Sequence, residues 1–378
     1  MIRNIQKSIA SLRVRAFMRV LFGVFLFLYF YFLQSPLLSL AQLQLSEGKT
    51  TYYPLVSSIV LSLVLLMVQK LVAKWIPFRE SLYCFSYVPS VILAVLTTAF
   101  TPAMNVSVLI FCAVAFVGFL LAAYISFSLS SYDEHGESYV RLLAVHSLGM
   151  VMVLFSLGAF SNSTDITTYE IKAAQYIQKM DYKKALKIGQ ESWASSPRLA
   201  ALRAYALSHT DKGLGECFFT YPLSVSGAEQ LLFSAEDTLA QLLPPDSLYA
   251  KLGVWRSSKE TALQFLERAL DRNNNTFAKD YWLTGLLLEK DLKQFSQDLP
   301  RLYALKDTVG LPKHYAEAMV LVGNEIDQRF LRDIDSTMIR AYQDYVAYGN
   351  QYSDSIQRCN QLHREYGKTY WWYYQYQH

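Results

Sequence analysis

The pattern of apolar positions divides the chain into two halves. Residues 1–160 contain long apolar runs, whereas residues 161–378 place apolar residues at a helical period between polar ones. A run of about 20 apolar residues is long enough to cross a bilayer as a helix. Five such crossings are predicted, at 16–34, 54–72, 82–100, 104–129 and 140–160. The pattern therefore predicts an all-α protein with a five-helix transmembrane anchor (1–160) followed by a helical-repeat domain (161–378).

The third and fourth predicted crossings come from one uncharged stretch. Between Ser81 and Tyr132 the chain has no Lys, Arg, Asp or Glu, and this stretch is too long for a single crossing. Thr101-Pro102 divides it into two segments of suitable length.

Basic residues in the short loops predict the orientation of the anchor. The N-terminal segment and the loop before the third crossing are rich in them: Arg3, Lys7, Arg13, Arg15, Arg19, Lys70, Lys74 and Arg79. The loops at 35–53 and 101–103 contain only Lys49. We therefore expect a cytoplasmic N-terminus and, after five crossings, residues 161–378 on the opposite side. The loop SYDEHGES (131–138) is assigned to the cytoplasm although it has no Lys or Arg.

The net charge of +4 belongs to the membrane half. Residues 1–160 hold ten Lys/Arg and five Asp/Glu, whereas residues 161–378 hold 25 and 26. A nucleic-acid-binding domain concentrates basic residues, and this domain balances them. The expected partners are therefore membrane lipid and protein, and not nucleic acid.

Candidate catalytic and metal-binding groups are few. The sequence has no GxGxxG, GxxxxGK[ST], GxSxG or HExxH motif and no CxxC or Cys/His spacing typical of zinc sites. Cys217 and Cys359 are expected to be free thiols, with a disulfide between them as the alternative. We accordingly expect no catalytic residue, cofactor or metal, and we favour a protein that is not an enzyme.

Two polar features of the membrane half are candidate sites. His146 is the one ionisable residue well inside a predicted crossing, and such residues are functional candidates. We expect a neutral imidazole bonded to a neighbouring helix, because no acidic partner is predicted at its depth. The stretch DEHGE (133–137) could ligate a metal or act as acid and base, but a solvated loop is the simpler interpretation.

The beginning of the second half resembles a tetratricopeptide repeat. With Pro197 aligned to the proline that ends helix B, residues 166–197 place large and small side chains at the packing positions of the helix pair. These positions are Tyr169, Ala173, Tyr176 and Ala185. Gly189 departs from the pattern, since an aromatic residue is usual there.

Weaker copies follow along the chain. Residues 246–274 place Ala250, Gly253, Ala262, Leu266 and Ala269 at equivalent offsets, and residues 278–305 form a third pair whose second helix Pro300 is predicted to interrupt. Further helices are predicted at 312–323, 333–348 and 351–366. The irregular spacing predicts a degenerate TPR-like α-solenoid with a concave groove suited to peptides or partner helices.

Two aromatic segments supply the candidate binding or docking residues. The segment 209–230 contains Phe219 and Tyr221 and is predicted to pack as a structured loop, with a ligand-gripping loop as the alternative. The C-terminal segment contains Tyr370, Trp371 and Trp372. Docking onto the solenoid is favoured over contact with a partner or a glycan, because an exposed aromatic patch of this size promotes aggregation.

The stretches ALRAYALSHTDKGLGECFFTYP (201–222) and YGKTYWWYY (366–374) carry a resemblance to an uncharacterised family. Its members are bacterial inner-membrane proteins with an N-terminal multi-span anchor and a tetratricopeptide-like periplasmic tail. The resemblance implies a multi-pass protein of the bacterial inner membrane with a periplasmic C-terminal domain, and it implies no particular reaction.

These observations lead to one functional expectation and one alternative. We expect a membrane-anchored helical-repeat scaffold that presents a protein-binding groove on the extracytoplasmic side of the inner membrane. The alternative is a membrane enzyme or carrier that acts on a lipid-linked or envelope glycan substrate. The loops expected outside the cytoplasm offer little for such chemistry, mainly Glu47, Lys49, Tyr52 and Tyr53.

Overall fold

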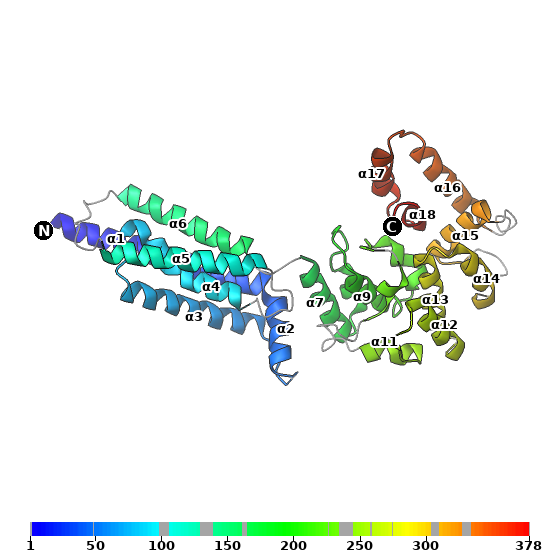
Figure 1. The fold of residues 1–378 in the computed structure, drawn as a ribbon, viewed down its shortest axis with the longest axis horizontal. Helices are drawn as coiled ribbons and strands as arrows, with labels where there is room; N and C mark the ends of the chain where they lie inside the picture. The colour runs from blue at the N-terminus through cyan, green and yellow to red at the C-terminus, as the bar shows by residue number, and fades with distance from the viewer. Residues whose placement is uncertain are drawn as a thin grey trace. The chain divides into compact units, whose positions relative to one another are not determined.

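A computed structural model describes residues 2–47, 49–97, 106–128, 139–160, 165–225, 227–233, 245–257, 259–273, 275–303, 310–326 and 334–377. These residues are mostly helical, and no strand occurs among them (Figure 1). The all-α prediction is therefore confirmed at the level of fold class. The loop 131–138, with its DEHGE stretch, lies outside the described residues.

The chain separates into two compact units, Met1–Thr164 and Asp165–His378. The first unit contains α1 (Ile2–Leu28), the π-helical turn Tyr29–Leu33, α2 (Ser35–Leu45), α3 (Pro54–Trp75), the 3-10 helix Glu80–Tyr87, α4 (Val88–Leu96), α5 (Val106–Ser128) and α6 (Tyr139–Ala159). Its long helices run lengthwise beside one another (Figure 1).

Four helices of the first unit are long and apolar enough to cross a membrane: Ser11–Leu33, Pro54–Trp75, Val108–Ser128 and Val140–Ala159. Their outward faces expose large apolar side chains, for example Val64, Ile110 and Phe155. Exposing so much apolar surface to water is unfavourable, whereas the hydrocarbon core of a bilayer solvates it well. The first unit therefore indicates a membrane protein.

The third predicted crossing (82–100) overlaps a shorter apolar helix, Glu80–Leu96. It begins with eight residues of 3-10 helix and continues with the nine residues of α4. A 3-10 helix rises about 2.0 Å per residue and an α-helix about 1.5 Å, so the segment is roughly 30 Å long. That length equals the thickness of a typical hydrocarbon core, although the residue count falls short of the usual 20.

The expectation that His146 lacks an acidic partner is wrong. His146 is buried in α6, and its Nε2 lies 3.1 Å from Oε2 of Glu80. The same carboxylate accepts hydrogen bonds from Arg15 at 2.6 Å and from Ser11 at 2.5 Å, both in α1. Glu80, whose side chain is partly buried, thus joins three helical segments through one polar cluster.

The second unit has a core of its own, surrounded by short helices. Among its described residues these are α7 (Asp165–Gln178), α8 (Tyr182–Lys187), α9 (Pro197–Leu207), α10 (Gly213–Cys217), the 3-10 turns Phe218–Thr220 and Ala228–Leu231, α11 (Pro245–Leu252), α12 (Ala262–Arg272), α13 (Thr276–Leu288), α14 (Leu292–Leu302), α15 (Lys313–Glu325), α16 (Ser336–Gly349), α17 (Ser355–Tyr366) and α18 (Tyr370–Tyr376). The largest buried side chains include Tyr281, Phe295 and Tyr315.

The first predicted repeat forms a helix pair, but its second helix is short. Ala173 of α7 and Ala185 of α8 are buried, and the two helices contact each other. The alignment on Pro197 is wrong in one respect, because α8 ends at Lys187 and Pro197 begins α9. Proline at the first helical position costs nothing, since that N–H has no partner in the helix.

Gly189 ends this helix pair for a steric reason. Its backbone is left-handed, with φ +61°, and a Cβ at this position would lie 2.7 Å from the ring of Tyr169. The aromatic residue that a regular repeat places here has no room, because Tyr169 fills the space.

The later pairs agree with their predicted positions apart from one proline. Thr261 and Gln264 form a capping box that begins α12, in which Ala262, Leu266 and Ala269 are buried. Pro300 lies inside α14, in its last turn, so the predicted interruption is wrong and the helix ends two residues later. The predicted helices at 312–323, 333–348 and 351–366 correspond to α15, α16 and α17.

Gly189→Ala is expected to destabilise the second unit. The added methyl group meets the Tyr169 ring, and overpacking of this kind costs about 1–3 kcal/mol in addition to the strain of a positive φ. Urea unfolding of the full chain in nanodiscs can be followed by tryptophan fluorescence, since five of the six tryptophans lie beyond residue 165.

Gly253→Ala is the matched control. Gly253 has a similar positive φ, of +74°, but the nearest atom to a Cβ there is Nδ2 of Asn273, at 3.3 Å, the end of a side chain that can move. Equal losses of unfolding free energy in the two variants would contradict the steric explanation.

Candidate functional site

The C-terminal helix α18 lies between α15 and α17 and is held by hydrogen bonds from its aromatic side chains (Figure 1). Tyr370 and Tyr373 donate their hydroxyls to the carbonyls of Leu287 and Leu288, at 3.0 and 2.9 Å. These are the last carbonyls of α13, which have no partner four residues further along the helix. The tyrosines therefore cap α13 while they position α18.

A buried carboxylate fixes the beginning of α18. Oε2 of Glu317, in α15, accepts a hydrogen bond of 2.7 Å from the backbone N–H of Tyr370 and lies 2.8 Å from Nδ1 of His314. The indole N–H of Trp371 donates to the Glu317 carbonyl at 2.8 Å. Glu317 and His314 are both buried, so these bonds replace the water that the Glu317 carboxylate and Nδ1 of His314 lose.

The structure brings most of the predicted site residues together. Tyr370, Trp371 and Phe219 are buried, and the Phe219 ring packs against the rings of Tyr370 at 5.0 Å and Tyr373 at 4.9 Å. Phe219 therefore lies under α18, although 150 residues separate it from that helix in the sequence. Tyr221 and Trp372 are half-buried and line one hollow.

This hollow, which we call the Trp372 hollow, has a volume of about 730 Å³. It is lined by four segments: Gln190–Trp193, Phe219–Leu223, His363–Lys368 and the α18 residues with Gln377. His363 lies between two indoles, 4.6 Å from Trp193 and 4.2 Å from Trp372 between ring centroids. Burial lowers the pKa of His363 below its usual value, which favours a neutral imidazole in this stack.

A buried arginine joins two walls of the Trp372 hollow. Arg203 of α9 donates to the carbonyl of Gly189 at 3.0 Å and to that of Pro222 at 3.4 Å, and its guanidinium lies 4.9 Å from the Tyr221 ring centroid. Burial lowers the pKa of Arg203 to about 10. The guanidinium of Arg203 contacts carbonyls and an aromatic face, and it thereby links the turn after α8 to the segment 221–222.

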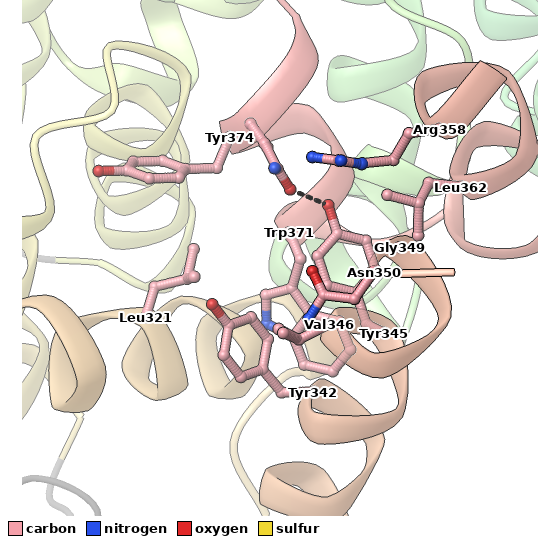
Figure 2. Close-up of a pocket in the computed structure, with 11 residues that line it drawn as sticks. Leu321, Tyr342, Tyr345, Val346, Gly349, Asn350, Arg358, Leu362, Trp371 and Tyr374 are labelled. Atoms are coloured by element: carbon pink, nitrogen blue, oxygen red, sulfur yellow. Dashed lines mark hydrogen bonds between the residues drawn. The ribbon is translucent and has the colours of Figure 1, made fainter. Parts of the chain in front are cut away.

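A second hollow, the Trp371 pocket, has a volume of about 420 Å³ (Figure 2). Its walls come from α15 to α18: Leu321, Tyr342, Tyr345, Val346, Gly349, Asn350, Arg358, Leu362, Trp371, Tyr374 and Gln375. Tyr345 donates its hydroxyl to Oε1 of Gln375, and burial raises the pKa of Tyr345 far above its usual value. The phenol therefore stays a donor at any physiological pH. Helix α18 contributes Trp371 to this pocket and Trp372 to the other hollow.

Sequence reasoning missed four important residues of this region. Glu317 and Arg358 lie on helices whose polar residues look solvent-exposed in the sequence, and nothing local marks either one. Tyr342 and Tyr345 are three residues apart, the spacing of one helix face, which is a weak signal of a shared surface. Their convergence on Trp371, at 5.2 and 5.8 Å between ring centroids, depends on tertiary structure.

The arrangement is suited to binding. Among the described residues no group of three or more His, Cys, Asp or Glu side chains could hold a metal ion, and all four cysteines are free thiols. Both hollows combine aromatic walls with amide and charged groups, which is the usual composition of a recognition site.

Residues 256–377 match a family of unknown function, DUF6057. The Trp371 pocket lies entirely within this segment, whereas the Trp372 hollow also uses residues before it. No curated protein and no solved structure matches the chain. The match agrees with the expected membership of an uncharacterised family and carries no activity with it.

Glu317→Ala is expected to loosen α18. The substitution leaves the Tyr370 N–H and the buried imidazole of His314 without their acceptor, at a cost of about 2–5 kcal/mol. Trypsin should then cleave after Lys368 or Arg364 faster in the full chain, as followed by loss of the C-terminal peptide in mass spectrometry.

Glu267→Ala serves as the control, because Glu267 is exposed on α12. Unchanged cleavage in Glu317→Ala would show that α18 does not depend on this carboxylate.

Proposed function

We propose that the protein is a membrane-anchored helical-repeat scaffold whose second unit binds a protein partner on the extracytoplasmic side of a bacterial inner membrane. The observation that carries this proposal is the Trp372 hollow, where aromatic residues from distant segments converge beside α18. Its volume of about 730 Å³ accommodates several side chains of a partner.

The chemistry of the Trp372 hollow favours a polypeptide. Trp193 is 77% exposed at its edge, and large exposed indoles are typical of the central contacts of protein interfaces. Charges of both signs surround the aromatic stack: Glu191, Arg364, Glu365 and Lys368. A polar rim around an aromatic centre is the common anatomy of such interfaces.

The proposed side follows from five crossings with a cytoplasmic N-terminus. The helix Glu80–Leu96 has about the length of a hydrocarbon core because its first half is 3-10 helix. Basic residues on the N-terminal segment and near Lys74 support the orientation. With four crossings, the N-terminus and the second unit would lie on the same side.

Single-cysteine labelling distinguishes the two topologies. In a chain whose four native cysteines are replaced by serine, Glu47→Cys and Ser257→Cys are expected to react with a membrane-impermeant maleimide in intact cells. Lys74→Cys should react only after lysis. If Glu47→Cys reacts and Ser257→Cys does not, the helix Glu80–Leu96 does not cross and the proposed location is wrong.

Photo-crosslinking tests the binding surface itself. Benzoyl-phenylalanine at Trp193, in the full chain in native membranes, is expected to give a discrete adduct with a partner protein. The same amino acid at Trp255, which is 61% exposed and lies outside both hollows, is the matched control and should give none. Identical adducts from the two positions, or no adduct from Trp193, would count against the Trp372 hollow as the binding site.

A further inference from the structure

The Trp371 pocket contains a guanidinium whose two terminal nitrogens have no hydrogen-bond partner among the described residues. Arg358 of α17 donates from Nε to the carbonyl of Tyr352 at 2.9 Å, and in the described part of the chain its two terminal nitrogens make no hydrogen bond. Figure 2 shows this side chain extending from α17 toward the hydroxyl end of Tyr345. The bond from Nε holds the guanidinium in this direction.

The charge of the Trp371 pocket is one-sided. Arg358 is the only cation among the lining residues of this pocket, and none of them is an Asp or a Glu. The Trp372 hollow differs, because Glu191 and Glu365 balance its basic residues. An anion therefore fits the Trp371 pocket, and the planar fork of an arginine pairs with a carboxylate through two parallel hydrogen bonds.

The remaining walls of the Trp371 pocket favour an apolar group next to the anion. Leu321, Val346 and Leu362 are aliphatic, and the rings of Tyr342, Tyr345 and Trp371 complete an apolar surface beside Arg358. A free phosphate gains nothing from such walls, whereas a carboxylate attached to an apolar side chain uses both features.

Two amides supply the groups that a peptide backbone needs. Oε1 of Gln375 accepts the Tyr345 hydroxyl, so the Gln375 amide nitrogen faces away from that bond and can donate to a ligand. Asn350 adds a second amide at the wall of the pocket. A simple hydrocarbon acid has no further polar group to hydrogen-bond with these amides, whereas a peptide unit has both a donor and an acceptor.

We propose that the Trp371 pocket binds the C-terminal carboxylate and the last apolar side chain of a partner polypeptide. Arg358 pairs with the carboxylate, the Gln375 and Asn350 amides bond the adjoining peptide unit, and the aromatic walls contact the apolar side chain. This inference rests on the proposed function, since it names the part of the partner that the second unit recognises.

The test compares one peptide in two forms. The full chain in nanodiscs is titrated with acetyl-Gly-Ala-(4-fluoro-Phe) bearing a free carboxylate and with the same peptide bearing a C-terminal amide, and binding is read from the ¹⁹F resonance. The acid is expected to bind at least tenfold more tightly than the amide. Arg358→Gln should abolish this preference, Arg358→Lys should retain part of it, and Arg272→Gln, the same charge change on α12, should leave it intact.

Each other outcome has a defined meaning. Equal binding of acid and amide, or a preference for the acid that persists in Arg358→Gln with an unchanged unfolding midpoint, overturns the inference and leaves the Trp193 crosslink unaffected. If 4-fluorophenylpropionate binds as tightly as the peptide acid, the ligand is a small carboxylic acid and the peptide-terminus assignment is wrong. Absence of the Trp193 adduct together with an Arg358-dependent preference would overturn the interface at the Trp372 hollow alone.

Discussion

The buried carboxylate of Glu317 determines where α18 lies, and both hollows depend on that helix. Oε2 of Glu317 accepts a hydrogen bond from the first backbone N–H of α18 and contacts His314. The backbone carbonyl of Glu317 accepts a hydrogen bond from the indole N–H of Trp371. A carboxylate is costly to bury, so these partners must be present together. Because Trp371 and Trp372 are consecutive on a helix placed in this way, they reach different hollows from one rigid element.

The helices, and four apolar segments long enough to cross a membrane, were predictable from the sequence because their signals are local. Apolar length marks the membrane segments and a 3.6-residue period marks the others, so the positions of α15, α16 and α17 were predicted closely. The errors concern side-chain pairs that are distant in the sequence. His146 contacts Glu80, which lies 66 residues earlier in the sequence. Pro197 begins α9, whereas the repeat pattern predicts that it ends a helix. The repeat class and the five-crossing anchor stay predictions.

The candidate site was predictable only as far as composition marks it. Clustered Tyr and Trp identified α18, and the aromatic segment at 219–221 identified the surface under it. Arg358 carries no such mark, because a basic residue on an amphipathic helix usually faces solvent. Its role follows from the packing of α16, α17 and α18 around one space, which no local pattern records.

The contact between His146 and Glu80 also bears on how the membrane unit assembles. Apolar helix faces are nearly interchangeable in lipid, since hydrocarbon solvates one as well as another, and polar contacts decide which faces meet. Arg15 and Ser11 are already synthesised when Glu80 emerges, but His146 emerges 66 residues later. The partners of Glu80 therefore come from both ends of the first unit, and the imidazole contact distinguishes one face of α6 from its apolar faces. Met150, Val153 and Leu157 of α6 pack into the core of the same unit, so polar and apolar contacts together define which face of α6 points inward.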